Sequence, residues 1–338
     1  MKKIKNLTRF GLAALLTLSL GYSVHAQLPA ASKIPAIPFG KIEIITTQIT
    51  PHFYALTGSK GVDPGHPEGA GGRIGVFVGP EGIFMVDASY APLSDKVMAA
   101  IRKISDAPIR FLVDTHEHPD HTGGNPNFAK LGALLFSREE VREDLIKPFP
   151  PAVAAVIGSA ASDKDPARLP TVTYGSKGTV KIYLNGEVID LIPVVTSHTN
   201  GDSMIKFEHE DVIMIGDFYR NYGYPFTDPT HGGTFKGIVS AVDTLLKIAG
   251  PNTKLLPGHG TVIQKKDLVL YRSMILDIQA KVQTMIGEGK TRPEVLAAKL
   301  TASYDVEVPG GITPLPAGLG TSADRFVGYM YDELKAAK

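Results

Sequence analysis

The 338-residue sequence contains no cysteine. No disulfide can therefore stabilise the chain, and no thiolate can act as a nucleophile or bind a metal. A metal site would have to be built from histidine and carboxylate side chains. The sequence also lacks a Gly-x-Ser-x-Gly element, so a serine nucleophile on a strand-to-helix elbow is not expected.

An excess of charge of either sign is absent as well. The chain has 35 Lys and Arg against 34 Asp and Glu, a formal net charge of +1, and no basic block after its first residues. This balance argues against a phosphate backbone as the ligand, so we expect no nucleic-acid partner. The partner we expect is a small-molecule substrate, and nothing in the sequence indicates the oligomeric state.

No apolar run is long enough to span a bilayer, which needs about 20 residues. The most apolar stretch, residues 11–20, is short and follows four basic residues, and Val24-His25-Ala26 then places small residues where a signal peptidase reads them. This arrangement predicts a secretory signal over residues 1–26, cleaved after Ala26. We therefore expect a periplasmic or secreted protein that has no contact with the membrane after cleavage.

Strand and helix patterns follow the same order in both halves of the chain. Strand-like runs at residues 74–78 and 83–86 precede a helical stripe and the strand Ile109–Val113, and a strand at 212–215 precedes a helical stripe and a strand at 254–256. Two such halves, packed sheet to sheet, predict an α/β protein. We expect a four-layer αββα sandwich of two mixed β-sheets with outer helices, forming one domain over residues 27–338 with further helices at its C-terminal end.

Four potential metal ligands fall within six residues directly after the strand Ile109–Val113: His116, His118, Asp120 and His121. In extended backbone, side chains two residues apart point the same way, so the first two histidines can grip one ion together. Asp120 and His121 follow a proline, where the chain turns, and can point at a second ion. Burying so many polar groups without a partner would be costly, so the cluster predicts a metal site.

Three further residues lie where other predicted strands end. His198 lies in a loop between strands, Asp217 ends an apolar strand, and His259 stands between two glycines. Each alone is a weak signal, since a carboxylate at the end of a strand is often only a turn residue. Because ligands gather at the carboxyl ends of strands in α/β proteins, these three positions match the first cluster.

The combined pattern resembles the ligand set of the metallo-β-lactamase superfamily, on the residues His116, His118, Asp120, His121, His198, Asp217 and His259. The resemblance covers nearly all of residues 42–300, and it implies an αββα sandwich with a site at the edge between the two sheets. It also implies two Zn²⁺ ions, with iron or manganese as alternatives. One ion would be held by His116, His118 and His198, the other by Asp120, His121 and His259, with Asp217 bridging them.

Hydrolysis is the chemistry that such a pair of ions would supply. Two ions can share a water and lower its pKa from about 15.7 toward roughly 7. The hydroxide would attack the carbonyl of an ester, thioester, lactone or β-lactam, with Asp120 as the catalytic residue that orients it and passes a proton to the leaving group. The commonest zinc lactamases carry a cysteine near the position of Asp217. With an aspartate at this position, the sequence is similar to glyoxalase II and to many general hydrolases of the superfamily.

Two other functions stay open at this point. Persulfide dioxygenases share the fold and similar ligands but use one iron, and histidine and carboxylate ligands are compatible with iron. A non-catalytic metal-binding protein would use the same ligands and would need no loop for a substrate.

Substrate contacts are expected close to Asp217 in the sequence. Arg220, which is either a clamp for an anionic group or a surface residue, and Tyr222 are the candidates. The glycine-rich loop 58–73 resembles a mobile flap of the family that closes over the substrate.

The remaining polar residues of interest are expected to lie around the site or away from it. Asp87, which ends a strand, either supports one of the histidine ligands or is a turn residue. His66 and His231 are expected to be exposed loop residues, and His52 and His209 to be plain surface residues.

Overall fold

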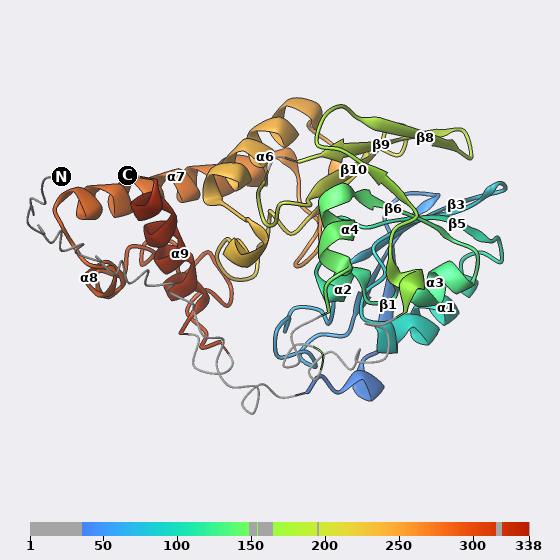
Figure 1. The fold of residues 1–338 in the computed structure, drawn as a ribbon, viewed down its shortest axis with the longest axis horizontal. Coiled ribbons are helices and arrows are strands. Elements are labelled where there is room, and N and C mark those ends of the chain that lie inside the picture. Colours follow the sequence, from blue (N-terminus) through green and yellow to red (C-terminus); the bar gives the residue numbers. More distant parts are fainter. Residues whose placement is uncertain (1–35, 149–153, 155–164, 195, 316–319, 338) are drawn as a thin grey trace, which may run out of the picture.

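The structure is a computed structural model that describes residues 36–148, 154, 165–194, 196–315 and 320–337 (Figure 1). The secretory signal predicted over residues 1–26 lies outside the described residues. Within the described part of the chain, no helix has both the length and the apolar character that crossing a bilayer would require.

The first sheet is mixed and contains seven strands in the order of the sequence. Its first four strands pair antiparallel, and the pairs from β4 to β7 are parallel. The strands are β1 (Ile44–Gln48), β2 (Phe53–Gly58), β3 (Ile74–Gly79), β4 (Gly82–Val86), β5 (Ile109–Val113), β6 (Leu134–Arg138) and β7 (Val172–Tyr174).

The second sheet is also mixed and has five strands in the order β12-β11-β10-β9-β8. Only its pair β11 and β12 is parallel. The strands are β8 (Val180–Leu184), β9 (Glu187–Pro193), β10 (Ser203–Phe207), β11 (Val212–Gly216) and β12 (Lys254–Pro257).

Helices cover the outer face of each sheet and extend beyond the sheets at the C-terminal end. Figure 1 shows the sheet of β8–β10 between α6 and the other sheet, with α1 and α3 on the far side. At the C-terminal end, α9 packs on α7 and α8 packs on α9. The α-helices are α1 (Ser94–Arg102), α2 (Pro119–Thr122), α3 (Asn125–Lys130), α4 (Glu139–Leu145), α6 (Phe235–Ile248), α7 (Lys265–Gly287), α8 (Arg292–Ala297) and α9 (Ser322–Ala336).

Alternation of apolar side chains along the strands explains the four layers. In β4, Ile83 and Met85 pack toward α1, whereas Phe84 and Val86 pack against the other sheet. Phe207 of β10 lies at the centre of the layer between the sheets and contacts the rings of three phenylalanines. The predicted α/β class and the sandwich of two mixed sheets with outer helices are thereby confirmed.

The loop 58–73 packs onto the rest of the protein at its C-terminal end. Its last four residues, 70–73, are buried, and Gly72 N donates to the Asp120 carbonyl at 3.0 Å. Arg73 is also buried, and its guanidinium donates to the carbonyls of Pro257 and Gly260. These contacts anchor the loop to the segments that carry the predicted ligands, because small residues let its backbone approach them closely.

Candidate metal centre

The first cluster lies directly after β5, as its position in the sequence predicted. His118 is extended, with φ −60° and ψ 144°, and Pro119 then begins the short helix α2, which carries Asp120 and His121. The change from extended to helical backbone turns the second pair of side chains away from the direction of His116 and His118. His116, Asp120 and His121 are all buried.

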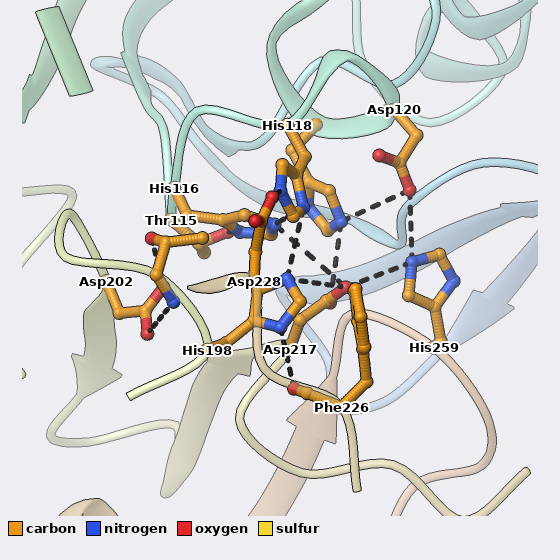
Figure 2. Close-up of polar contacts among 12 residues, drawn as sticks. Thr115, His116, His118, Asp120, His198, Asp202, Asp217, Phe226, Asp228 and His259 are labelled. Atoms are coloured by element: carbon orange, nitrogen blue, oxygen red, sulfur yellow. Dashed lines mark hydrogen bonds and ion pairs between the residues drawn. The ribbon is translucent and has the colours of Figure 1, made fainter. Parts of the chain in front are cut away.

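Three ring nitrogens form the first group of candidate ligands (Figure 2). His118 Nδ1 lies 3.2 Å from His116 Nε2 and 3.0 Å from His198 Nε2. Nitrogens at about 2.0–2.1 Å from a tetrahedral ion lie roughly 3.4 Å from one another, so the group has the dimensions of a metal site. His198 reaches it from the loop between β9 and β10.

The second group joins His121 to residues that follow β11 and β12. His259 Nε2 lies 3.0 Å from Asp120 Oδ2 and 3.3 Å from Asp217 Oδ2. His121 Nε2 lies 3.5 Å from Asp120 Oδ2 and 3.4 Å from Asp217 Oδ1. Since β11 and β12 are parallel neighbours, their carboxyl ends place Asp217 and His259 at the same edge of the sheet.

Asp217 lies between the two groups. Its Oδ2 is 3.7 Å from His198 Nε2 and 3.9 Å from His116 Nε2, while the same carboxylate faces His259 and His121 on its other side. All seven residues singled out in the sequence therefore converge on one place.

Unpartnered atoms show that this donor set fits metal ions. Asp120 Oδ2, His121 Nε2, Asp217 Oδ1 and His259 Nε2 are buried and make no hydrogen bond within the described part of the chain. Buried polar atoms normally have a partner, because leaving one without costs free energy. Nitrogen and oxygen atoms that face one another at these distances are suited to a divalent cation such as zinc.

The electrostatics of the second group reflect the close approach of unlike charges. Burial raises the pKa of Asp217, but the facing His259 and His121 rings bring it well below its ordinary value, and the Asp120 pKa is likewise held low by His121 and His259. Burial lowers the pKa of His259, yet Asp217 and Asp120 raise it to about 9. His121 is shifted upward in the same way.

The pKa shifts in the first group differ from those in the second, because the first group consists of three histidine rings. Burial lowers the pKa of His198 to about 3, with the His118 ring adding to the effect, and His116 is also well below its ordinary value. His118 is the exception. Burial opposes its protonation, but a hydrogen bond with Asp228 raises its pKa to about 9.

Asp87 supports a ligand, which was one of its two predicted roles. Its Oδ2 lies 2.8 Å from His121 Nδ1, and its two oxygens accept from the backbone N and the Oγ1 of Thr115. This contact directs Nε2 of His121 into the centre. Asp87 has a φ of 61°, a left-handed conformation in which aspartate is among the tolerated residues.

Asp228 is a site residue that the sequence analysis missed. Its Oδ2 lies 3.0 Å from His118 Nε2 and 2.7 Å from His231 Nδ1. Asp228 therefore orients His118 as Asp87 orients His121. The third ring of the group, His198, is held by its Nδ1, which donates to the Phe226 carbonyl at 3.0 Å. The one signal in the sequence was Asp228-Pro229, which reads equally well as an ordinary turn.

The expectations for the other histidines are partly wrong. His66 is not an exposed loop residue, since its side chain is 20% exposed and its ring stacks on that of His259. His231 is only partly buried, but its contact with Asp228 joins it to the support of His118. His52 and His209 are exposed as predicted.

A cavity of about 320 Å³ opens onto the metal centre. His118, Asp120, His198 and Asp217 form part of its wall. Arg220 and Tyr222, predicted as substrate contacts, both line it, and so does the loop segment 63–68. The geometry thus provides a metal centre beside a space for a small molecule.

Comparisons with known proteins agree with this geometry. The family model described as the metallo-beta-lactamase superfamily matches residues 69–259. A metallo-beta-lactamase from Pontibacter korlensis has a TM-score of 0.55 at 16% identity and covers 70% of this chain and 100% of its own. A stereoselective inverting sec-alkylsulfatase from a Pseudomonas species has a TM-score of 0.60 at 14% identity, over 86% of this chain and 50% of its own. At these identities the likeness establishes the fold.

Two curated relatives share shorter segments with the chain. A linear primary-alkylsulfatase of a Pseudomonas strain is 52% identical over 71 residues, which are 21% of this chain and 12% of the relative. The alpha subunit of a 2,4-dinitroanisole O-demethylase from a Nocardioides strain is 24% identical over 155 residues, 45% of this chain and 41% of the relative. The chain therefore spans less than half the length of either relative.

Proposed function

Because the chain belongs to the metallo-beta-lactamase superfamily, we propose that it is an exported hydrolase that binds two zinc ions and cleaves a small substrate at an ester, thioester, lactone or β-lactam carbonyl. The position of Asp217 carries the proposal. Its carboxylate faces His198 on one side and His259 on the other, so the two groups of ligands act as one centre. Export to the periplasm or the medium rests on the signal sequence predicted in residues 1–26.

The ligand set divides in the way that the family resemblance implies. His116, His118 and His198 would hold one ion, and Asp120, His121 and His259 would hold the other, with Asp217 shared between them. Bound there, the ions would supply Lewis-acid activation of a water and of a substrate oxygen.

Asp120 is the residue we assign to proton handling. Its Oδ2 is buried, has no hydrogen-bond partner within the described chain and faces the centre of the site. The low pKa of Asp120 keeps it ionised at neutral pH, so it can accept a hydrogen bond from a water. The loop segment 63–68 and Tyr90, which line the same cavity, would restrict the access of bulk water.

A sulfate ester is the second candidate substrate. It is favoured by the 52% identity that 71 residues of the chain share with a protein named linear primary-alkylsulfatase. Its hydrolysis would consume one water and release an alcohol and hydrogen sulfate, with the proton passing to the leaving oxygen.

Metal analysis combined with turnover tests the proposal. Protein purified from the exported fraction should contain about two zinc ions per chain and should hydrolyse at least one member of a panel of esters, thioesters, lactones, β-lactams and alkyl sulfates. His116→Ala should abolish turnover, and His209→Ala, at an exposed position, should not.

The outcomes separate the alternative functions. One iron per chain, with oxygen uptake on a persulfide, would replace the hydrolase by a dioxygenase. Two bound zinc ions without turnover on any substrate of the panel would indicate a metal-binding protein without catalysis.

A further inference from the structure

Two arginines from distant parts of the chain line the cavity at the metal centre. Arg220 lies four residues after β11 ends, and Arg325 lies in the first turn of α9. Neither guanidinium makes a hydrogen bond or an ion pair with the residues for which side chains are described. All but one of the Asp and Glu residues lie in the described part of the chain, and the exception is Asp163.

Arg325 is held in place by an aromatic ring and not by a carboxylate. Its guanidinium carbon lies 3.9 Å from the centroid of Phe226. A guanidinium that stacks on a ring keeps the N–H groups at its edge available for a ligand. The Phe226 ring is 5.4 Å from that of His198, so Arg325 is separated from a metal ligand by one side chain.

No carboxylate of the cavity wall forms an ion pair with either of the two arginines. Both arginines line the same cavity, and burial, together with the charge of Arg220, lowers the pKa of Arg325. Four carboxylates lie in the wall. Asp63 is engaged by Gly65 and His66, Asp120 and Asp217 face the histidine ligands, and Glu68 Oε1 lies 3.9 Å from His259 Nδ1. A partly buried cation without a partner is costly, and an anionic ligand would remove this cost.

A comparison with Arg73 supports this interpretation. Arg73 is buried near the same centre, but its guanidinium donates to two backbone carbonyls and so has a structural role. The two cavity arginines have no such acceptors. The first turn of α9 also places Ser322 at the cavity, and the positive end of a helix adds to the attraction for an anion.

We propose that Arg220 and Arg325 together form a subsite for an oxyanion headgroup, a sulfate or a carboxylate, on a substrate with an apolar body. Ile37, Tyr222, Phe226, Pro314 and Leu315 line the same cavity and would contact that body. The inference deepens the proposed function and rests on it, since the headgroup would direct the substrate toward the metal centre. Arg325 lies beyond residues 69–259, so the C-terminal helices would contribute this specificity.

Binding of octane-1-sulfonate tests the subsite, because its carbon–sulfur bond is not hydrolysed. Titration calorimetry on the metal-loaded protein should give an affinity that falls about tenfold or more in Arg325→Gln and in Arg220→Gln. Arg325→Lys keeps the positive charge but loses the two parallel N–H donors of the guanidinium. Its affinity for the sulfonate should lie between those of wild type and Arg325→Gln. Arg102→Gln, at an exposed position of α1, is the matched control and should bind like wild type.

Further ligands define the chemistry of the subsite. Octanoate in place of the sulfonate separates a carboxylate subsite from a sulfate subsite. Octan-1-ol and inorganic sulfate should each bind more weakly than octane-1-sulfonate, because each provides only half of the contacts. Equal affinity for octan-1-ol and the sulfonate would overturn the proposal, as would unchanged sulfonate affinity in both arginine variants while circular dichroism shows them folded.

The test is independent of catalysis. Loss of sulfonate binding in the variants of a protein without turnover would retain the subsite and reject the hydrolase. Zinc-dependent hydrolysis that is unaffected by either arginine variant, for neutral and anionic esters alike, would retain the hydrolase and reject the subsite.

Discussion

The imidazole of His66 lies parallel to that of His259, with the ring centroids 4.0 Å apart and 5° between the planes. This stack joins the loop before β3 to the segment after β12, two parts of the chain almost 200 residues apart in sequence. His66 Nδ1 lies 3.2 Å from Asp63 Oδ2, and its Nε2 is 3.8 Å from Asp120 Oδ2. The loop is thus part of the metal centre.

His66→Ala should weaken the second metal site and leave the first intact. A stacked ring pair contributes about 0.5–1.5 kcal/mol, so we expect a two- to tenfold loss of affinity for one of two zinc ions. Competition with a chromophoric chelator measures both affinities. His66→Phe should keep the affinity, and His209→Ala serves as the exposed control. Equal weakening of both ions would contradict this role.

Asp87→Asn and Asp228→Asn should each lower zinc affinity by about 10- to 100-fold, because each removes the charged partner that orients a histidine ligand. The first should affect the ion held by His121 and the second the ion held by His118. Asparagine preserves the shape of both side chains. Asp106→Asn, at an exposed position, is the control, and chelator competition at equilibrium is the measurement. An unchanged affinity in both variants would remove the supporting role.

Gly258→Ala should disrupt the centre without unfolding the protein. A Cβ at this position would overlap Asp217 Oδ1 and lie 2.8 Å from His121 Cε1. Both are predicted metal ligands and would have to move, so we expect less than two zinc ions per chain by elemental analysis. Gly175→Ala, where a Cβ would meet nothing within 4 Å, should retain the wild-type metal content. Full metal content in Gly258→Ala would show that the ligand positions are not as described.

Zinc binding at pH 7 should release protons. In the metal-free protein the pKa of His118 and of His259 is raised to about 9 and that of His121 is raised as well, so all three rings are protonated at pH 7. A metal requires the neutral ring, so about three protons leave on loading. The number should fall as the pH rises through 9, because the rings of His118 and His259 are then already neutral. Calorimetry in buffers of different ionisation enthalpy measures it, and no release at pH 7 would contradict the raised pKa values.

Phe207→Ala should destabilise the layer between the sheets. The side chain is fully buried against Phe53, Phe77 and Phe84, and large-to-small changes of this kind cost about 3–5 kcal/mol. Urea unfolding followed by circular dichroism should show a midpoint well below that of wild type. Tyr183→Ala, at a side chain that is 70% exposed, should change the midpoint little. A similar midpoint for both variants would contradict the packing described.

The sequence alone was sufficient for the local parts of the structure. The apolar runs at residues 74–78 and 83–86 predicted two strands, and the spacing of His116, His118, Asp120 and His121 around Pro119 predicted the division into two directions. Both follow from backbone geometry over a few residues. Asp217 and His259 could also be identified from the sequence, because a polar residue at the end of an apolar strand can be recognised there.

Only the tertiary structure decided which distant residues share a surface. The sequence indicated an exposed loop residue at His66, but in the structure its ring stacks on His259. Asp228 reads as a turn residue in the sequence, but in the structure it contacts His118. Arg325 lies more than 100 residues from Arg220, yet the fold of α9 places both in one cavity. Local propensity depends on neighbours along the chain, whereas these contacts depend on how the helices and loops pack on the sheets, and no short stretch of sequence contains that information.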